Sequence, residues 1–159
     1  MTGRSILRVI MCLALCLGVG GITGSVTAAE ITGWYAKLVQ PSWTPPNWAF
    51  PVVWTALYIL MGLSLWLLWD RSRPGALRTW AIGMFFVQLI LNAAWSPVFF
   101  SLHQTRLALV IIIVLMIAIA ATIAWAWHAQ RTAAWLLMPY LVWVCYAVTL
   151  NAGIVALNP

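Results

Sequence analysis

The sequence has very little charge. Only 6% of its 159 residues are Asp, Glu, Lys or Arg, whereas soluble domains carry roughly a quarter, and the only acidic residues are Glu30 and Asp70. Hydrophobic residues make up 65% of the chain, and its mean hydropathy is +1.00. These proportions exclude an ordinary soluble domain and indicate an integral membrane protein.

The apolar runs themselves lack ionisable residues, because every Lys, Arg, Asp and Glu falls at the end of a run or between runs. Proton pumps and ion-coupled transporters generally carry a titrating group near the membrane midplane, so the sequence argues against ion-motive transport. The eight basic residues give a formal charge of +6 but form no stripe that could follow a phosphate backbone. We therefore expect no nucleic-acid partner.

Residues for catalysis or metal binding are also scarce. The sequence has no serine elbow, glycine-rich phosphate loop or pair of carboxylates for acid–base chemistry. His103 and His128 lie near the ends of apolar runs and are interpreted as interfacial residues, so no run offers a buried histidine that could ligate a metal. Cys12 and Cys16 provide half of a zinc site, and together with Cys145 they are interpreted as small packing residues. We expect no metal and no cofactor.

What the sequence does have is a series of apolar runs, each of which reaches the roughly 20 residues that a membrane-spanning helix needs. They cover residues 6–28, 48–69, 77–102, 107–128 and 133–157. The runs are continuously apolar, with no alternation of period two, which excludes membrane β-strands. The sequence predicts an all-α, polytopic membrane protein: one domain, residues 1–159, that forms a five-helix bundle. Only its first loop, residues 29–47, is long.

Basic residues are distributed unevenly between the two ends of such a bundle. The side that carries the N-terminus would hold Arg4, Arg8, Arg71, Arg73, Arg78 and Arg131, and the other side would hold Lys37 and Arg106. The positive-inside rule then predicts a cytoplasmic N-terminus and an external first loop. A cleaved signal peptide ending near "SVTAAE" is the alternative, and it would leave four spans. We favour retention, because the first run exceeds a usual signal core and Gly20 and Gly24 have the spacing of a helix contact.

The first loop and the start of the second run contain the segment "PSWTPPNWAFPVVWTALY", residues 41–58. Prolines stiffen this segment, and tryptophans give it rigid aromatic surface. Loops are usually polar and variable, so the segment predicts a lid or wall over a pocket for a flat, apolar ligand.

Aromatic and neutral polar residues recur at helical spacing inside three of the runs. The three stripes are Gln88, Asn92, Trp95 and Ser96; Tyr140, Trp143, Ala147 and Asn151; and Trp54 with Tyr58. An amide in hydrocarbon needs a partner, so Asn92 is predicted to face the bundle interior, and the stripes together could line one cavity. From the pattern alone, Trp54, Trp95 and Trp143 fit packing and ligand contact equally well.

Other tryptophans stand near the ends of runs and are interpreted as membrane-interface anchors. They are Trp66, Trp69, Trp80, Trp125, Trp127 and Trp135. Pro97 and Pro139 fall inside apolar runs, where they are expected to kink their helices.

Three segments together resemble the TspO/MBR family, which includes the tryptophan-rich sensory proteins of bacteria and the mitochondrial translocator protein. They read "WYAKLVQPSWTPPNWAFPVVWTALY", "NAAWSPVFF" and "PYLVWVCYAVTLN", and they occur in order between Trp34 and Asn151. The resemblance implies a five-helix bundle with an uncleaved first span, commonly a homodimer. It also implies a pocket under the first loop that binds porphyrins such as protoporphyrin IX, in an integral multi-pass protein of a bacterial membrane, inner or outer.

The resemblance also implies roles for single residues. Trp54 and Trp143 are similar to two pocket tryptophans linked to light-dependent porphyrin breakdown, so they would be catalytic if such breakdown is real. Tyr35, Asn92 and Ala147 match ligand-contacting positions. Trp43, Pro45 and Pro46 match the covering loop.

One departure from the family pattern concerns sterols. The stretch "LNAGIVALNP" at the end of the fifth run lacks the Tyr and the basic residue of the proposed sterol motif, so high-affinity cholesterol binding is not expected. Two functions stay open. The first is a porphyrin-binding sensor, regulator or transporter, and the second is an enzyme-like degradation of the bound porphyrin that depends on light and oxygen.

Overall fold

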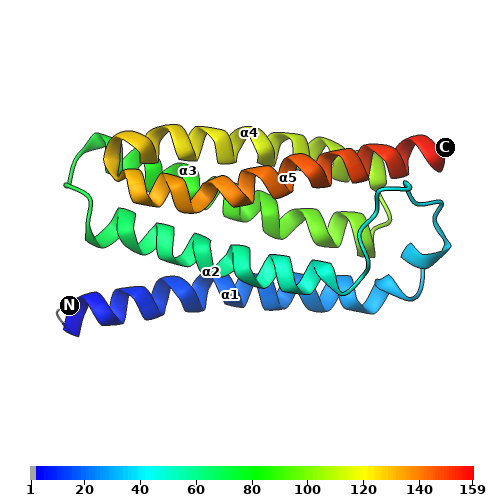
Figure 1. Ribbon diagram of the computed structural model, residues 1–159, viewed down its shortest axis with the longest axis horizontal. Helices are drawn as coiled ribbons and strands as arrows, with labels where there is room; N and C mark the ends of the chain where they lie inside the picture. Colours follow the sequence, from blue (N-terminus) through cyan, green and yellow to red (C-terminus); the bar gives the residue numbers. More distant parts are fainter. Residues whose placement is uncertain (1–2) are drawn as a thin grey trace.

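The computed structural model describes residues 3–159 as a bundle of five long helices that run along one axis, with the two termini at opposite ends (Figure 1). The helices are α1 (Gly3–Ile31), α2 (Ala49–Asp70), α3 (Ala76–Ser96), α4 (Thr105–Ala129) and α5 (Arg131–Leu157). All five are long and apolar enough to cross a membrane. The predicted all-α, five-span architecture is confirmed, with boundaries that differ by a few residues.

The connections between helices are short except for the first. Gln130 alone, in an extended conformation, separates α4 from α5, which forces these helices to pack as antiparallel neighbours. The first loop contains a 3-10 turn at Tyr35–Lys37 and ends where α2 begins. Pro51 falls in the first turn of α2, where a missing backbone N–H costs no hydrogen bond.

The two prolines predicted to kink helices behave differently. At Pro97 the α-helical pattern of α3 changes to a π-helical turn, Pro97–Ser101, in which the Leu102 N–H donates to the carbonyl of Pro97 at 2.9 Å. Such wide turns are frequent at functional sites. Helix α5, in contrast, continues through Pro139.

The core of the bundle is apolar and tightly packed. It contains fully buried side chains from several helices, among them Met61, Phe85, Ile119 and Leu137. Helix α4 has the highest hydropathy of the five spans and packs against α3 and α5. Helix α4 contributes no residue to the cavity described below, so its role is to pack against α3 and α5.

Helices α1 and α2 approach each other closely at one point in the bundle. A Cβ on Gly62 would lie 2.9 Å from the Leu13 Cδ2 and 3.1 Å from the carbonyl oxygen of Cys12, so only glycine fits. Cys12 and Cys16 are buried in this region, as predicted for packing residues. Cys145 is exposed on α5, so the packing interpretation was wrong for that residue.

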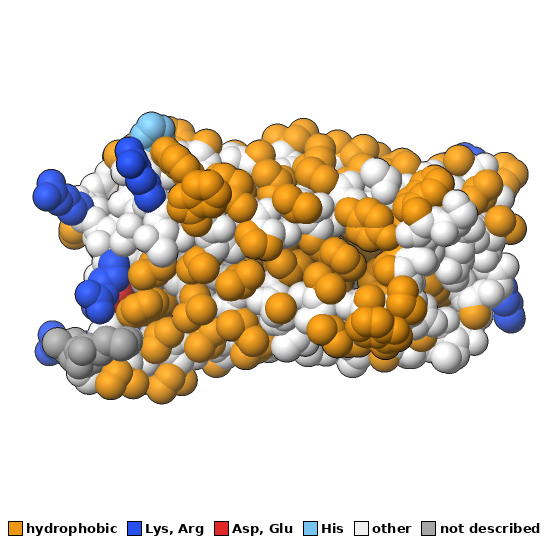
Figure 2. Space-filling model, in the orientation of Figure 1, with side chains coloured by type: hydrophobic (Ala, Val, Ile, Leu, Met, Phe, Trp, Pro, Cys, Tyr) orange, Lys and Arg blue, Asp and Glu red, His pale blue; other side chains and the backbone are white. Residues whose placement is uncertain are grey.

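Basic side chains gather at the end of the bundle that carries the N-terminus, and few lie at the opposite end (Figure 2). Asp70, the last residue of α2, accepts hydrogen bonds there from the Ser5 hydroxyl at 2.7 Å and from the Arg8 Nη1 at 2.8 Å. The Nε of Arg71 lies 3.5 Å from the same carboxylate. These contacts fasten the start of α1 to the end of α2.

The tryptophans interpreted as interface anchors gather at this same basic end. The guanidinium groups of Arg8, Arg71 and Arg131 lie 5.4 to 6.0 Å from the ring centroids of Trp69, Trp66 and Trp127, respectively. Trp80 stacks on Trp125, and Trp135 packs on Trp127. A belt of tryptophans paired with arginines suits the boundary between lipid and water. Its position in a bilayer, like the orientation of the protein, stays a prediction.

Candidate functional site

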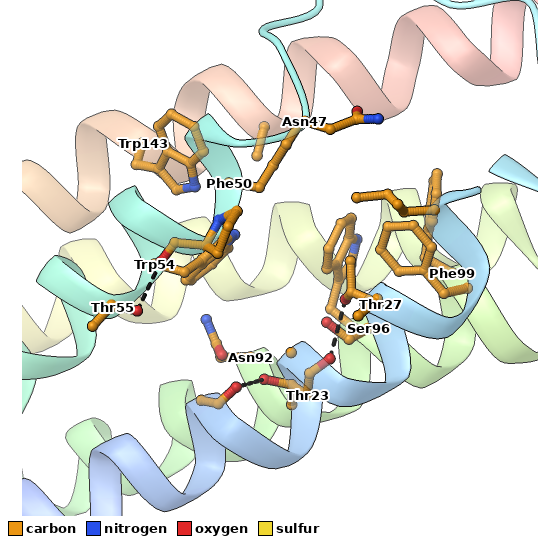
Figure 3. A pocket seen from close by; sticks show the side chains of 18 of the residues that line it. Thr23, Thr27, Asn47, Phe50, Trp54, Thr55, Asn92, Ser96, Phe99 and Trp143 are labelled. Carbon is orange, nitrogen blue, oxygen red and sulfur yellow. Dashed lines mark hydrogen bonds between the residues drawn. The ribbon is translucent and has the colours of Figure 1, made fainter. Parts of the chain in front are cut away.

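A cavity of about 630 Å³ lies between α1, α2, α3 and α5, in the half of the bundle nearest the first loop. Its volume falls within the roughly 300–1,000 Å³ of small-molecule and cofactor sites. Figure 3 shows Trp54 and Trp143 on one side of the cavity, Phe99 and Ser96 on the other, and Asn92 and Thr23 below them.

One wall consists of aromatic rings from α2 and α5. The indoles of Trp54 and Trp143 meet edge to face, with ring centroids 6.5 Å apart and planes at 88°. Phe50 contacts Trp143 in a similar arrangement, and the ring centroids of Trp54 and Tyr58 lie 5.7 Å apart. Such edge contacts leave ring faces available to a flat ligand.

The opposite wall comes from the end of α3 and the π-helical turn that follows it. Trp95 stacks on Phe99 at 5.2 Å, and Phe99 meets Phe100 at 4.8 Å. Phe99 and Phe100 both line the cavity and are both buried. They extend the aromatic wall of Trp95 beyond the end of α3.

The floor of the cavity is a chain of neutral hydrogen bonds that joins four helices. The Tyr58 hydroxyl donates to the Asn92 Oδ1 at 2.5 Å, and the Asn92 Nδ2 donates to the Tyr140 hydroxyl at 2.9 Å. The hydroxyls of Thr23 and Tyr58 are 3.3 Å apart. Asn92 thus faces the interior, as predicted, and finds its partners there.

A second amide, that of Asn151, holds the Trp95 indole of this aromatic wall in place. The Trp95 Nε1 donates to the Asn151 Oδ1 at 3.2 Å, and the Asn151 Nδ2 donates to the Thr105 carbonyl at 3.0 Å. Asn151 therefore sets the orientation of an indole in the cavity while it ties α5 to the start of α4.

A further wall comes from α1 and is made mainly of small residues, flanked by Leu17 and Ile31. It contains Gly20, Gly21, Thr23, Gly24, Thr27 and Ala28. The spacing of Gly20 and Gly24 predicted a helix contact at both. Gly20 contacts Tyr58, whereas a Cβ on Gly24 would meet nothing within 4 Å in the same chain, so a contact of Gly24 with another subunit stays a prediction. Since α1 forms a wall of the cavity, cleavage after "SVTAAE" would remove that wall.

The structure brings many of the predicted ligand-binding residues to this cavity. Those that line it are Tyr35, Trp54, Tyr58, Asn92, Trp95, Trp143, Ala147 and Asn151. Trp48, Phe50, Phe99 and Phe100 also line it, although sequence reasoning did not select them. Phe99 and Phe100 continue the helical stripe of Asn92, Trp95 and Ser96 by one turn, and that spacing is the signal that could have found them.

The other predicted residues lie away from the cavity surface. Tyr140 is fully buried and contacts the lining residues Asn92, by a hydrogen bond, and Trp54, by an edge-to-face ring contact. Gln88 is fully buried one turn before Asn92, and neither atom of its amide has a partner among the described residues. Trp43, Pro45 and Pro46 are outside the set of lining residues, so in this structure they form an outer part of the loop.

The first loop is fastened to α5. The Tyr146 hydroxyl donates to the Trp43 carbonyl at 2.6 Å, and the Asn158 amide makes two 3.0 Å hydrogen bonds with the backbone of Val39. A Cβ on Gly153 would lie 2.5 Å from the Pro41 Cγ, so α5 and the loop touch there as well. These contacts hold the loop across the end of the bundle.

The cavity is electrically neutral. Its lining residues include no Asp, Glu, Lys, Arg or His, and burial together with the nearby Tyr146 raises the pKa of Tyr35 above its ordinary value. His103 lies outside, stacked on Trp34 and 3.6 Å from a carboxylate oxygen of Glu30. Among residues 3–159 no group of three His, Cys, Asp or Glu side chains could hold a metal ion.

The fold and the cavity define a class: a five-span membrane protein with an aromatic, uncharged chamber closed at one end by a proline- and tryptophan-rich loop. The profile of the TspO/MBR family matches residues 12–157, which is most of the chain. The protein belongs to the TspO/MBR family.

Relatives with similar sequences come from different domains of life. The tryptophan-rich protein TspO of Chlorobaculum tepidum is 38% identical over 98% of this chain and 99% of its own length. The tryptophan-rich sensory protein of Cereibacter sphaeroides is 36% identical over 92% of this chain and 88% of its own. The human translocator protein is 42% identical over 74% of this chain and 70% of its own.

Proposed function

We propose that the protein binds a flat, largely apolar tetrapyrrole, with protoporphyrin IX as the reference ligand, and that it senses, regulates or transports porphyrins in the membrane. The observation that carries the proposal is the cavity of about 630 Å³ enclosed by Trp54, Trp95, Trp143 and Phe99. Planar aromatic surfaces on facing walls favour a planar aromatic ligand.

The polar groups of the cavity support a neutral binding site more than a reaction centre. Tyr58 and Asn92 are already hydrogen-bonded to each other, and the lining residues include no histidine, cysteine or methionine to ligate a metal. No lining group is an evident general acid or base. A macrocycle would therefore be held by its ring faces, with hydroxyls and amides available to its polar edge.

Titration of protoporphyrin IX into the purified, detergent-solubilised protein tests the proposal. We expect saturable quenching of tryptophan fluorescence together with a shift of the main porphyrin absorption band, because four tryptophans, Trp48, Trp54, Trp95 and Trp143, line the cavity. Free tryptophan in the same micelles is the control. Quenching that rises without saturation, as in that control, would contradict specific binding.

A second candidate function is oxidative degradation of the bound porphyrin with light and molecular oxygen. The observation that favours it is the edge-to-face pair of Trp54 and Trp143, whose indoles can supply electrons to an excited macrocycle in the same cavity. Oxygen would be the oxidant: the electron lent by an indole passes from the macrocycle to O2, and it returns to the indole cation when the reduced oxygen adds to the porphyrin ring. The net step adds O2 to the porphyrin, consumes no indole and needs no protein acid or base.

Illumination of the porphyrin complex separates this function from simple binding. If the indoles take part, Trp54→Phe and Trp143→Phe should each slow the loss of the main porphyrin band severalfold at equal porphyrin occupancy. Trp125→Phe is the matched control, since Trp125 stacks on Trp80 outside the cavity. Equal bleaching in all variants, or in micelles without protein, removes the catalytic role.

Three further features are part of the proposal. We infer a homodimer, a bacterial membrane and weak or absent cholesterol binding, the last because the final turns of α5 lack a basic residue.

A further inference from the structure

We infer that the cavity opens sideways into the bilayer, through a gap between the second half of α1 and the first half of α2, and that ligands enter by this gap. The inference rests on the proposed function, in which the cavity holds an apolar ligand. It extends that function by naming the hydrocarbon phase, and not the aqueous phase, as the source of the ligand.

The contact between α1 and α2 loosens toward the loop end. Gly62 of α2 touches Leu13 and the backbone of Cys12 on α1. Nearer the first loop, Gly20 of α1 touches the ring of Tyr58 on α2. At Gly24, one turn beyond Gly20 on the same helix, a Cβ would meet nothing within 4 Å. The two helices are therefore packed up to Tyr58 and diverge after it.

Most of the accessible edge of the cavity lies on these two helices, and Asn47 of the first loop is the other exposed lining residue. The lining residues of α1 that are exposed are Leu17, Gly21, Gly24 and Ala28, and those at the start of α2 are Trp48, Pro51 and Thr55. Each set follows the spacing of one helix face. The lining residues of α3 and α5, in contrast, are all buried or half-buried.

The end of the bundle nearest the loop offers no comparable opening on the α5 side. Tyr146 and Asn158 hold the loop there through the backbone of Trp43 and Val39, and Pro41 packs on Gly153. A ligand that entered under the loop would have to break these contacts. A ligand that entered between α1 and α2 would pass the small residues Gly21, Gly24 and Ala28 on α1. On the α2 side it would pass the exposed ring of Trp48, followed by Pro51 and Thr55.

The gap lies at the depth of the hydrocarbon core. Helix α1 has 29 residues, so it is about 43 Å long, whereas the core is about 30 Å thick. Gly24 stands seven residues before the last residue of α1, Ile31, which places it about 10 Å from that end. With the helix centred in the membrane, Gly24 faces acyl chains, where a porphyrin would partition.

A fluorescent label on the far wall of the cavity tests the gap without any porphyrin. In a Cys145→Ser background, Ala147→Cys would carry a thiol-reactive bimane, and the protein would be reconstituted into vesicles of nitroxide-labelled phospholipid. We expect the lipid nitroxide to quench the bimane and aqueous iodide to leave it unchanged, because residue 147 lines the cavity from α5.

Two substitutions on α1 then locate the route. Gly24→Trp should lower the lipid quenching at position 147 by at least about half, whereas Gly18→Trp should not change it. Gly18 is the matched control, since it is exposed on the same helix, has nothing within 4 Å of its Cβ and does not line the cavity. Quenching by iodide, quenching by neither reagent, or no effect of Gly24→Trp would overturn the inference.

Binding kinetics provide the second measurement. When porphyrin-loaded vesicles are mixed with proteoliposomes, Gly24→Trp should bind protoporphyrin IX about tenfold more slowly than Gly18→Trp does. Equal rates in the two variants would contradict the route. If the wild-type protein binds no porphyrin while lipid still quenches position 147, then the proposed ligand is wrong and the opening to the bilayer stands.

Discussion

Replacement of Ala147 by tryptophan is expected to weaken protoporphyrin IX binding by at least about a hundredfold, which corresponds to about 2.7 kcal/mol, while the bundle stays folded. Ala147 lies one turn after Trp143 on α5 and lines the cavity, where it leaves room beside the indole. A second indole at this position would occupy the space that the macrocycle needs. The measurement is a porphyrin titration of the purified variant alongside the wild type.

The matched control for this prediction is Ala152→Trp. Ala152 is exposed on the same helix and does not line the cavity, so the added indole would face outward. We expect this variant to bind porphyrin with the wild-type affinity. If both variants bind like the wild type, the ligand does not use this cavity, and the proposed site is wrong even if binding itself is real.

Replacement of Gly62 by leucine is expected to destabilise the protein by at least about 3 kcal/mol, the upper part of the range for overpacked sites. A Cβ there would lie 3.0 Å from the Leu13 Cα and 3.1 Å from the Cys12 carbonyl oxygen. Because these neighbours are backbone atoms, no change of rotamer can relieve the contact, and α1 must move away from α2. Unfolding in mixed detergent micelles, followed by circular dichroism, measures the loss.

Gly83→Leu is the control for that substitution. Gly83 lies inside α3, is exposed, and has nothing within 4 Å of its Cβ. Leucine is the better helix former by somewhat less than about 1 kcal/mol, so this variant should be as stable as the wild type or slightly more stable. A Gly62→Leu protein that unfolds like Gly83→Leu would show that α1 and α2 are not packed at this point.

The sequence was sufficient for the architecture and for several site residues. Charge depletion and the length of the apolar runs are local properties, and the bilayer imposes helices on any such run, so five spans could be counted directly. Asn92 could be placed in the interior for a similar reason, because an amide in hydrocarbon must find a partner. The structure supplies those partners in Tyr58 and Tyr140.

The composition of the cavity walls could not be predicted in this way. Gln88 and Tyr140 share helical stripes with cavity residues, yet they lie behind the cavity surface, because the distance of each helix from its neighbours decides which members of a stripe are covered. Trp43 was predicted to lie in the covering loop and to bind ligand, whereas it is outside the set of lining residues and its backbone carbonyl is held by Tyr146, a residue far along the sequence.

The sequence by itself determined that this protein is a five-helix membrane bundle with amides and indoles in its interior, since hydropathy and helical period depend only on neighbouring residues. Only the tertiary structure decided that glycines of α1 form one wall, that the chain after Pro97 takes a π-helical turn whose Phe99 and Phe100 belong to another, and that α1 and α2 part beyond Gly20. Those features depend on how side chains from distant segments pack together, and no local pattern records that packing.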